Sequence, residues 1–142
     1  MADPFDLDRF LKAQEEDYDT ALDELRSGRK RTHWIWYIFP QIAGLGRSPT
    51  AQHYAIRSLE EARAYLQHPI LGARLHESLK VLQLLSATSA DEVFGPLDAI
   101  KFRSSLTLFA EADAGDAIVA AALDRWFAGE KDEATIDLLG RA

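Results

Sequence analysis

The stretch HWIWYIFPQIAGLG, residues 33–46, contains six consecutive large apolar side chains from Trp34 to Phe39, then Pro40 and a glycine turn. Such a run fits a buried strand or a buried helical turn, and periodicity cannot choose between them. Pro40 ends the element in either case. Because the chain has no second strand-like run to pair with this one, a strand would leave its backbone groups unsatisfied. We therefore favour a short buried helix.

On the N-terminal side of this stretch, the pattern predicts two short helical segments. Asp6 is positioned to cap a first turn or two. A separate helix is predicted from about Glu15 to Arg26, where apolar side chains recur at i, i+4 and i+7. Gly28 follows this helix as its stop signal.

On the C-terminal side, the sequence is again a series of helix signals. Ser48 followed by Pro49 is a helix start, with serine at the N-cap and proline at the first helical position. Ser-x-x-Glu at residues 58–61 and at residues 89–92 has the form of a capping box. Apolar periodicity predicts further helices over about residues 69–85, 96–112, 117–128 and 133–139.

Length and composition are those of one globular domain. The chain has 142 residues, of which 47% are apolar, enough for a core and too many for disorder. No apolar stretch approaches the roughly 18 to 20 residues of a membrane span. The N-terminus lacks the features of a signal peptide, and there is no cysteine. We expect a cytoplasmic, all-α protein with a single compact domain over residues 1–142, built from about seven or eight short helices.

Charge is distributed unevenly along the chain. The net charge is −7, yet residues 28–59 contain five basic side chains and no Asp or Glu. The acidic remainder makes nucleic acid an unfavourable partner, because five clustered cations are a poor track along a duplex. They are sufficient for one or two phosphates. We therefore predict that these cations meet at one anion-binding hollow; they are Arg29, Lys30, Arg31, Arg47 and Arg57.

The order of these residues resembles a widespread bacterial and fungal family without an established function. The resemblance is carried by the tryptophan motif of residues 33–41, by Gly44-Leu45-Gly46, and by Asp98, Lys101 and the run of residues 104–109. It covers nearly the whole chain. Some members carry the label "calpastatin", although nothing in this sequence indicates a protease inhibitor. The resemblance implies a single, entirely helical domain and implies no reaction.

The loop of residues 44–49 is the first candidate for binding chemistry. A glycine-rich loop that leads into a capped helix can present backbone N–H groups to an anion. Gly46 and Ser48 would contribute these groups, and Arg47 and Lys30 would add cationic contacts. The alternative is an ordinary turn and cap, since neither a Walker lysine nor a dinucleotide fingerprint is present.

Aromatic and amide side chains beside this loop could hold the organic part of a ligand. Trp34 or Trp36 could stack on a flat ring, although core packing of both is the stronger interpretation. Gln41 lies in a predicted loop. Its side-chain amide could hydrogen-bond to the edge of a ligand ring, or only to free backbone groups of the loop. His33 could carry a proton or could be a structural histidine that caps a helix.

Asp98, Lys101 and Ser105 are spaced at i, i+3 and i+7 and share one helix face. Asp98 and Lys101 could form a plain helix ion pair. If this face borders the basic segment, Lys101 joins the anion site and Asp98 orients a partner. In an enzyme, His33 and Asp98 would be the catalytic proton carriers.

The sequence supports two functional hypotheses. The first is a pocket that binds a phosphorylated small molecule of the nucleotide or sugar-phosphate type, with hydrolase or transferase activity left open. The second is an interaction module whose cationic patch docks an acidic partner or a second copy of the chain. No cofactor is predicted, and the four histidines lack metal-ligand spacing. The oligomeric state stays open.

Overall fold

The computed structural model describes residues 3–87 and 89–140, and every named element in these ranges is helical. The all-α prediction is confirmed, and the described part forms one compact domain. Nine helices rather than seven or eight are present in the described residues. They are α1 (Asp8–Ser27), α2 (Ile35–Ile38), α3 (Pro49–His53), α4 (Leu59–Gln67), α5 (Leu71–Gln83), α6 (Ala90–Phe94), α7 (Pro96–Ala112), α8 (Ala117–Phe127) and α9 (Glu133–Gly140).

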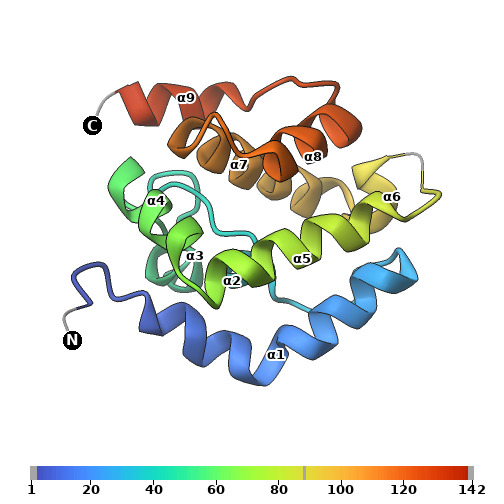
Figure 1. Cartoon of the computed structure of the whole chain (residues 1–142), viewed down its shortest axis with the longest axis horizontal. Helices are drawn as coiled ribbons and strands as arrows, with labels where there is room; N and C mark the ends of the chain where they lie inside the picture. Colours follow the sequence, from blue (N-terminus) through green and yellow to red (C-terminus); the bar gives the residue numbers. More distant parts are fainter. Residues whose placement is uncertain (1–2, 88, 141–142) are drawn as a thin grey trace.

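The helices pack in successive layers around a shared core. In Figure 1, α1 forms the lower edge, α5 crosses the middle, and α7, α8 and α9 form the upper half. Helix α5 contacts both α1 and α8, and α7 contacts α4, α6, α8 and α9. The short helix α2 contacts both α1 and α7, so the motif stretch lies between the two longest helices.

Helix α1 is continuous for 20 residues, so the prediction of two separate segments is wrong. No glycine or proline interrupts residues 8–27, and buried side chains continue at helical spacing through Phe10, Gln14 and Tyr18. Asp6 is not the cap. The carboxylate of Asp3 accepts the N–H groups of Leu7 and Asp8, at 2.9 and 3.0 Å.

The motif stretch forms the short buried helix that was favoured from the sequence. Trp34 and Phe39 flank α2 and are 1% and 0% exposed. The Phe39 ring contacts that of Phe102 on α7, with 4.9 Å between centroids. After Pro40, an isolated parallel bridge joins Ile42 to Ile56. This bridge is the one piece of strand-like pairing in the described residues, and it fixes where the glycine turn begins.

The three serine caps predicted from the sequence are confirmed. The hydroxyls of Ser48, Ser58 and Ser89 accept the N–H groups of Ala51, Glu61 and Glu92, at 3.1, 3.1 and 3.2 Å. Helix α5 begins at Leu71 rather than at Pro69. The reason is His68, whose Nδ1 accepts the N–H groups of Ile70 and Leu71 and so takes the place of a cap.

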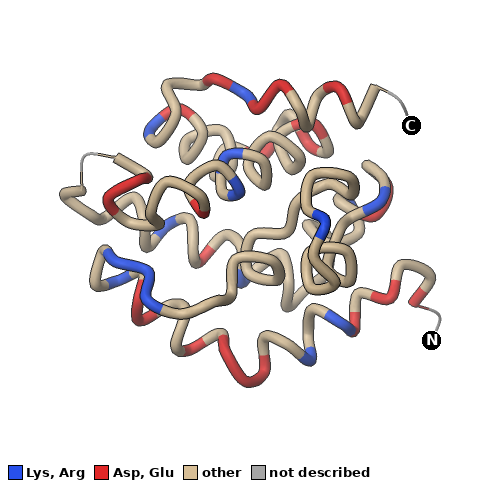
Figure 2. Tube along the Cα trace, turned by 180° about the vertical axis from the view of Figure 1, so that it is seen from behind, with Lys and Arg blue, Asp and Glu red and all other residues tan. Residues whose placement is uncertain are grey.

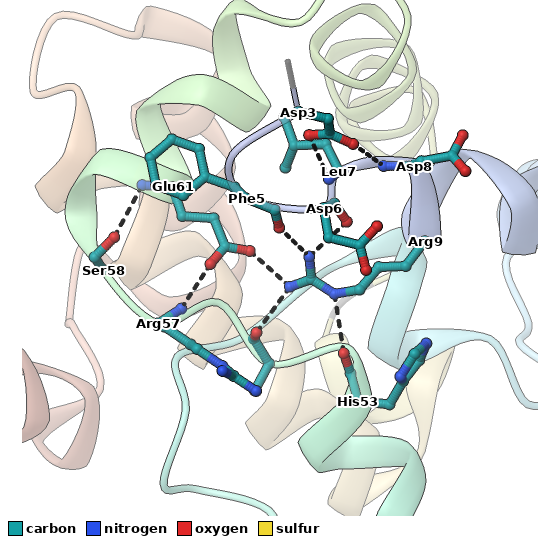
Figure 3. Close-up of polar contacts among 11 residues, drawn as sticks. Asp3, Phe5, Asp6, Leu7, Asp8, Arg9, His53, Arg57, Ser58 and Glu61 are labelled. Atoms are coloured by element: carbon teal, nitrogen blue, oxygen red, sulfur yellow. Dashed lines mark hydrogen bonds and ion pairs between the residues drawn. The ribbon is translucent and has the colours of Figure 1, made fainter.

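A nearly buried arginine ties the start of α1 to the connection between α3 and α4 (Figure 3). The guanidinium of Arg9 makes five hydrogen bonds, of 2.6 to 3.0 Å, to acceptors on both segments. These acceptors are the backbone carbonyls of Phe5, Asp6, His53 and Ala55 and the carboxylate of Glu61. The other Glu61 oxygen accepts the Arg57 N–H at 3.1 Å, so neither charge is left unpaired.

A second buried carboxylate organises the connection between α1 and α2. Glu24 is 8% exposed and accepts the N–H groups of Arg31 and Thr32, at 2.7 and 2.9 Å. The Thr32 hydroxyl donates at 2.7 Å, and the Trp34 indole N–H donates at 3.0 Å. Burial alone would raise the pKa of the Glu24 carboxyl, but these four donors outweigh it and lower the pKa to about 2.

We therefore expect Glu24→Gln to destabilise the protein at pH 7. The folded-state pKa lies below the ordinary value of 4.5, so the stabilisation is present above that pH and is lost as the pH falls toward 2. The shift corresponds to about 3 kcal/mol of unfolding free energy at neutral pH. Urea unfolding at several pH values should show the gap between variant and wild type closing below pH 4.5. Glu16→Gln, on an exposed position of the same helix, is the matched control. A gap that does not depend on pH would contradict the assignment.

Candidate functional site

Three segments distant in the sequence meet at an open hollow of about 280 Å³. The first is the loop that follows Pro40, with Gln41, Leu45 and Gly46, together with Ala51 of α3. The second is the N-terminal part of α7, and the third is the approach to α9 around residues 132–134. The hollow thus combines the end of the tryptophan motif with the helix face that carries Lys101.

The loop wall of the hollow depends on a close contact that only glycine permits. A Cβ on Gly46 would lie 2.5 Å from the Cβ of Ala51, well inside any normal contact. Gly44 has a φ of 104°, a conformation that side chains disfavour. The Gln41 amide Nε2 donates to the Phe39 carbonyl at 2.6 Å, which leaves its Oε1 for another donor. The two glycines therefore let the loop fold back on α3 beside Gln41.

The α7 wall carries a carboxylate shared by two ammonium groups. Asp98 lies 2.7 Å from Lys30 Nζ and 3.3 Å from Lys101 Nζ. The Lys30 side chain is only 5% exposed and also lies over the Trp34 ring. One carboxylate between two cations leaves a surplus positive charge. Because Lys101 lines the hollow and is the more exposed lysine, this charge is available there.

The third wall is fixed by Asp132. Its Oδ2 accepts from the Ser104 hydroxyl at 3.0 Å and from the backbone N–H and hydroxyl of Thr135, at 3.1 and 2.6 Å. The Asp132 N–H donates to the Thr107 hydroxyl at 2.9 Å. No partner for Oδ1 is found among the described residues, so this oxygen can accept a hydrogen bond from a ligand.

Two large apolar side chains stand exposed beside these polar groups. Leu97 and Ile100 line the hollow from α7 and are 73% and 60% exposed. Leucine and isoleucine normally bury most of their surface, and exposed apolar groups gathered at a hollow are typical of binding surfaces. The hollow therefore offers one cation, two free acceptors and an apolar rim.

The structure brings some of the predicted binding residues together. Gln41, Gly46 and Lys101 line the hollow, and Asp98 holds Lys101 from outside it. Trp36 is half-buried in a much smaller recess that shares Gln41, Gly46 and Ala51 with the hollow. Trp36 is thus the nearer of the two candidate tryptophans.

Other predicted residues lie elsewhere. Trp34 belongs to the core and hydrogen-bonds to Glu24. His33 and Arg47 are exposed and are not among the lining residues. Ser48 caps α3, which is the plain structural role weighed against anion binding. Ser105 is completely buried and its hydroxyl has no hydrogen-bond partner in the described part of the chain.

The five basic side chains of residues 28–59 do not meet at one hollow, which corrects the expectation drawn from their clustering. Lys30 is held by Asp98, Arg29 lies beside Leu85 and Ala87, and Arg57 lies beside His53. Figure 2 shows basic segments scattered over the molecule and interrupted by acidic ones. The reason is geometric, since residues 29–31 lie between α1 and α2, whereas Arg47 and Arg57 lie in the connections on either side of α3.

Sequence reasoning missed Asp132, Leu97 and Ile100 as lining residues. Asp132 lies in the charged run of residues 130–133, and nothing local distinguishes it from its neighbours. Leu97 and Ile100 fit the apolar pattern of α7 and would ordinarily be assigned to the core. The sequence did offer one signal for Asp132, namely the unusual number of hydroxyl side chains on α7. Buried hydroxyls require hydrogen-bond partners, so a polar residue from another segment was to be expected beside them. One of those partners is Asp132.

The structure is that of a small all-α protein with an open surface hollow beside α7. The chain belongs to the family described as "Protein of unknown function (DUF1810)", whose model matches residues 4–139. It is similar to a solved structure, that of the conserved hypothetical protein Rv1873 from Mycobacterium tuberculosis. The two share 49% identity with a TM-score of 0.94, over 97% of this chain and 99% of that one. No curated protein matches the chain.

None of the helices in the described ranges is long and apolar enough to cross a bilayer. Within residues 3–87 and 89–140, no three or more His, Asp or Glu side chains are grouped so that they could hold a metal ion.

We expect Gly46→Ala to destabilise the protein, because the new methyl group would overlap the Ala51 side chain. Overpacking of this kind costs about 1 to 3 kcal/mol in unfolding free energy. Urea denaturation should show the loss, whereas Gly140→Ala, which meets nothing within 4 Å, should be nearly neutral.

A double variant tests whether the Gly46–Ala51 contact is the cause. Ala51→Gly removes the atom that the new methyl group would strike, at a helix-propensity cost of about 1 kcal/mol. The combined variant should therefore lose less than the sum of the two single losses. Strict additivity would show that the loop is not held by this contact.

Proposed function

We propose that the protein binds a small molecule with one anionic group and an apolar body in the hollow between residues 41–46 and α7. The observation that carries the proposal is the convergence of Gln41, Lys101 and Asp132 on one hollow with exposed apolar side chains. Side chains so far apart in sequence, with free polar atoms beside an apolar surface, are typical of small-molecule sites.

Lys101 supplies the contact for the anionic group. Asp98 already holds Lys30, so it neutralises Lys101 only in part and fixes the direction of its side chain. A ligand anion at Lys101 would pair with the ammonium group that Asp98 neutralises only in part, while the Asp132 carboxylate requires a hydrogen-bond donor on the rest of the ligand. A hydrogen bond to a charged group contributes about 1.5 to 3 kcal/mol.

The remaining free atoms at the hollow are acceptors. Asp132 Oδ1 and Gln41 Oε1 suit hydroxyl or amino donors on the ligand, and Leu97 and Ile100 suit its apolar part. The volume lies just below the range of roughly 300 to 1,000 Å³ occupied by drug-sized ligands. A sugar phosphate or another small hydroxylated acid fits this size better than a dinucleotide.

The proposal concerns binding and does not include a reaction. His33 is not among the lining residues, and Asp98 is engaged by two lysines. Proton transfer by this pair, whether in a hydrolase or a transferase, stays a prediction from the sequence. The ligand chemistry follows from the lining residues alone.

The exposure of Leu97 and Ile100 favours one alternative, a docking face for another protein. A partner segment with an apolar side chain followed by a carboxylate would satisfy the rim and Lys101 together. Docking of an acidic partner or of a second copy would depend on salt, because exposed charges are screened.

We expect Lys101→Met to weaken the binding of an anionic ligand by about tenfold or more, since a charge-assisted contact is lost. The measurement is the thermal shift produced by a panel of ribose 5-phosphate, glucose 6-phosphate, AMP, benzoate and inorganic phosphate. Lys80→Met, on an exposed position of α5, should leave any shift unchanged. Phosphate and carboxylate compounds in the panel distinguish the two kinds of anion.

The same panel decides between the two hypotheses. A shift that survives in Lys101→Met would contradict the proposed site. If no compound shifts the melting temperature and the apparent mass on a sizing column depends on salt, small-molecule binding is contradicted and the docking face is supported. An unchanged mass with a Lys101-dependent shift supports small-molecule binding.

A further inference from the structure

A second hollow, of about 420 Å³, lies on the part of the molecule where the N-terminal segment meets the α3–α4 connection. Residues 4–6 line one side of it, and His53, Arg57 and Ser58 line the other. Arg9 and Glu61 lie between these two sides (Figure 3). None of these residues belongs to the hollow beside α7.

The middle of this second hollow is rigid and nearly neutral. Arg9 and Glu61 are paired at 2.6 Å, and their side chains are 10% and 4% exposed. The five hydrogen bonds of Arg9 use the donors of its guanidinium, so it has none left for a ligand. The pair therefore acts as a fixed support for the side chains around it.

Three polar side chains around this support are unpaired, and two of them, Asp6 and Arg57, carry opposite charges. The Asp6 carboxylate, the Arg57 guanidinium and the His53 imidazole line the hollow, and within the described residues none of the three forms a hydrogen bond or ion pair. In Figure 3, Asp6 and Arg57 lie on opposite sides of the Arg9 guanidinium. The hollow thus presents one free negative and one free positive charge that do not satisfy each other.

We propose that this hollow binds a small zwitterion of the α-amino-acid type. The ligand carboxylate pairs with Arg57, whose planar guanidinium suits bidentate contact, and the ligand ammonium pairs with Asp6. Phe5 and Pro4 offer apolar surface to the ligand side chain. A simple anion would be repelled by Asp6 and a simple cation by Arg57, so a molecule with both charges is favoured.

The test is a titration of the full-length, ¹⁵N-labelled protein with each of the twenty L-amino acids, followed by NMR. At least one amino acid should shift the amide signals of residues 5–9 and 53–61. Asp6→Asn and Arg57→Gln should each weaken that binding by about tenfold or more. Both positions are exposed, and asparagine tolerates the left-handed φ of 52° at residue 6, so both variants should fold.

Matched controls show whether both ligand charges and this particular hollow are required. The N-acetyl and the amide derivatives of the bound amino acid each lack one charge and should bind about tenfold more weakly. Lys101→Met should leave the affinity unchanged, which makes the outcome independent of the function proposed for the α7 hollow. Arg29→Gln, another exposed cation, should also have no effect.

Three results would overturn the proposal. The first is that no amino acid perturbs the signals of residues 5–9 and 53–61. The second is an affinity that Asp6→Asn and Arg57→Gln leave unchanged. The third is equal binding of the N-acetyl derivative or of inorganic phosphate, which would make the hollow a plain anion site.

Discussion

The burial of the Glu24 carboxylate is the interaction on which the arrangement around the motif stretch depends. One carboxylate receives two backbone N–H groups, a hydroxyl and an indole N–H from residues 31–34. A buried carboxylate without these donors would be costly, and so would the buried donors without the carboxylate. The requirement fixes the chain as it leaves α1 and places Trp34 in the core, so α2 can enter between α1 and α7.

From this anchor, the position of the candidate site follows step by step. Helix α2 ends before Pro40, and the bridge between Ile42 and Ile56 holds the next residues. The glycines then turn the loop onto α3, close enough to meet α7 and the segment before α9. On α7, Asp98 joins the basic segment to the same place through Lys30 and Lys101. The hollow is thus a product of packing among three segments that are distant in the sequence.

Much of the fold was accessible from local signals, and part of the site was not. Serine caps, helix-stop glycines and apolar periodicity depend on near neighbours, so the starts of α3, α4 and α6 were predicted correctly. The continuity of α1 was missed because residues 12–17 contain no large apolar side chain that would extend the helical pattern, and Asp6 was taken for the cap. The structure shows Asp3 performing that role from outside the helix. Gln41 and Lys101 were found, whereas Asp132 was not, because its partner Ser104 is 28 positions away.

The sequence by itself determined the helical class, the helix caps and the glycine turn, because each depends on residues within a few positions of one another. It also determined the family resemblance, which depends on the order of residues along nearly the whole chain. Only the tertiary structure decided where the charged side chains lie relative to one another. Clustering in sequence suggested that five cations share one hollow, but burial of Lys30 against Asp98 and the divergence of the loops separate them. Side-chain direction is set by long-range packing, and no local pattern encodes it.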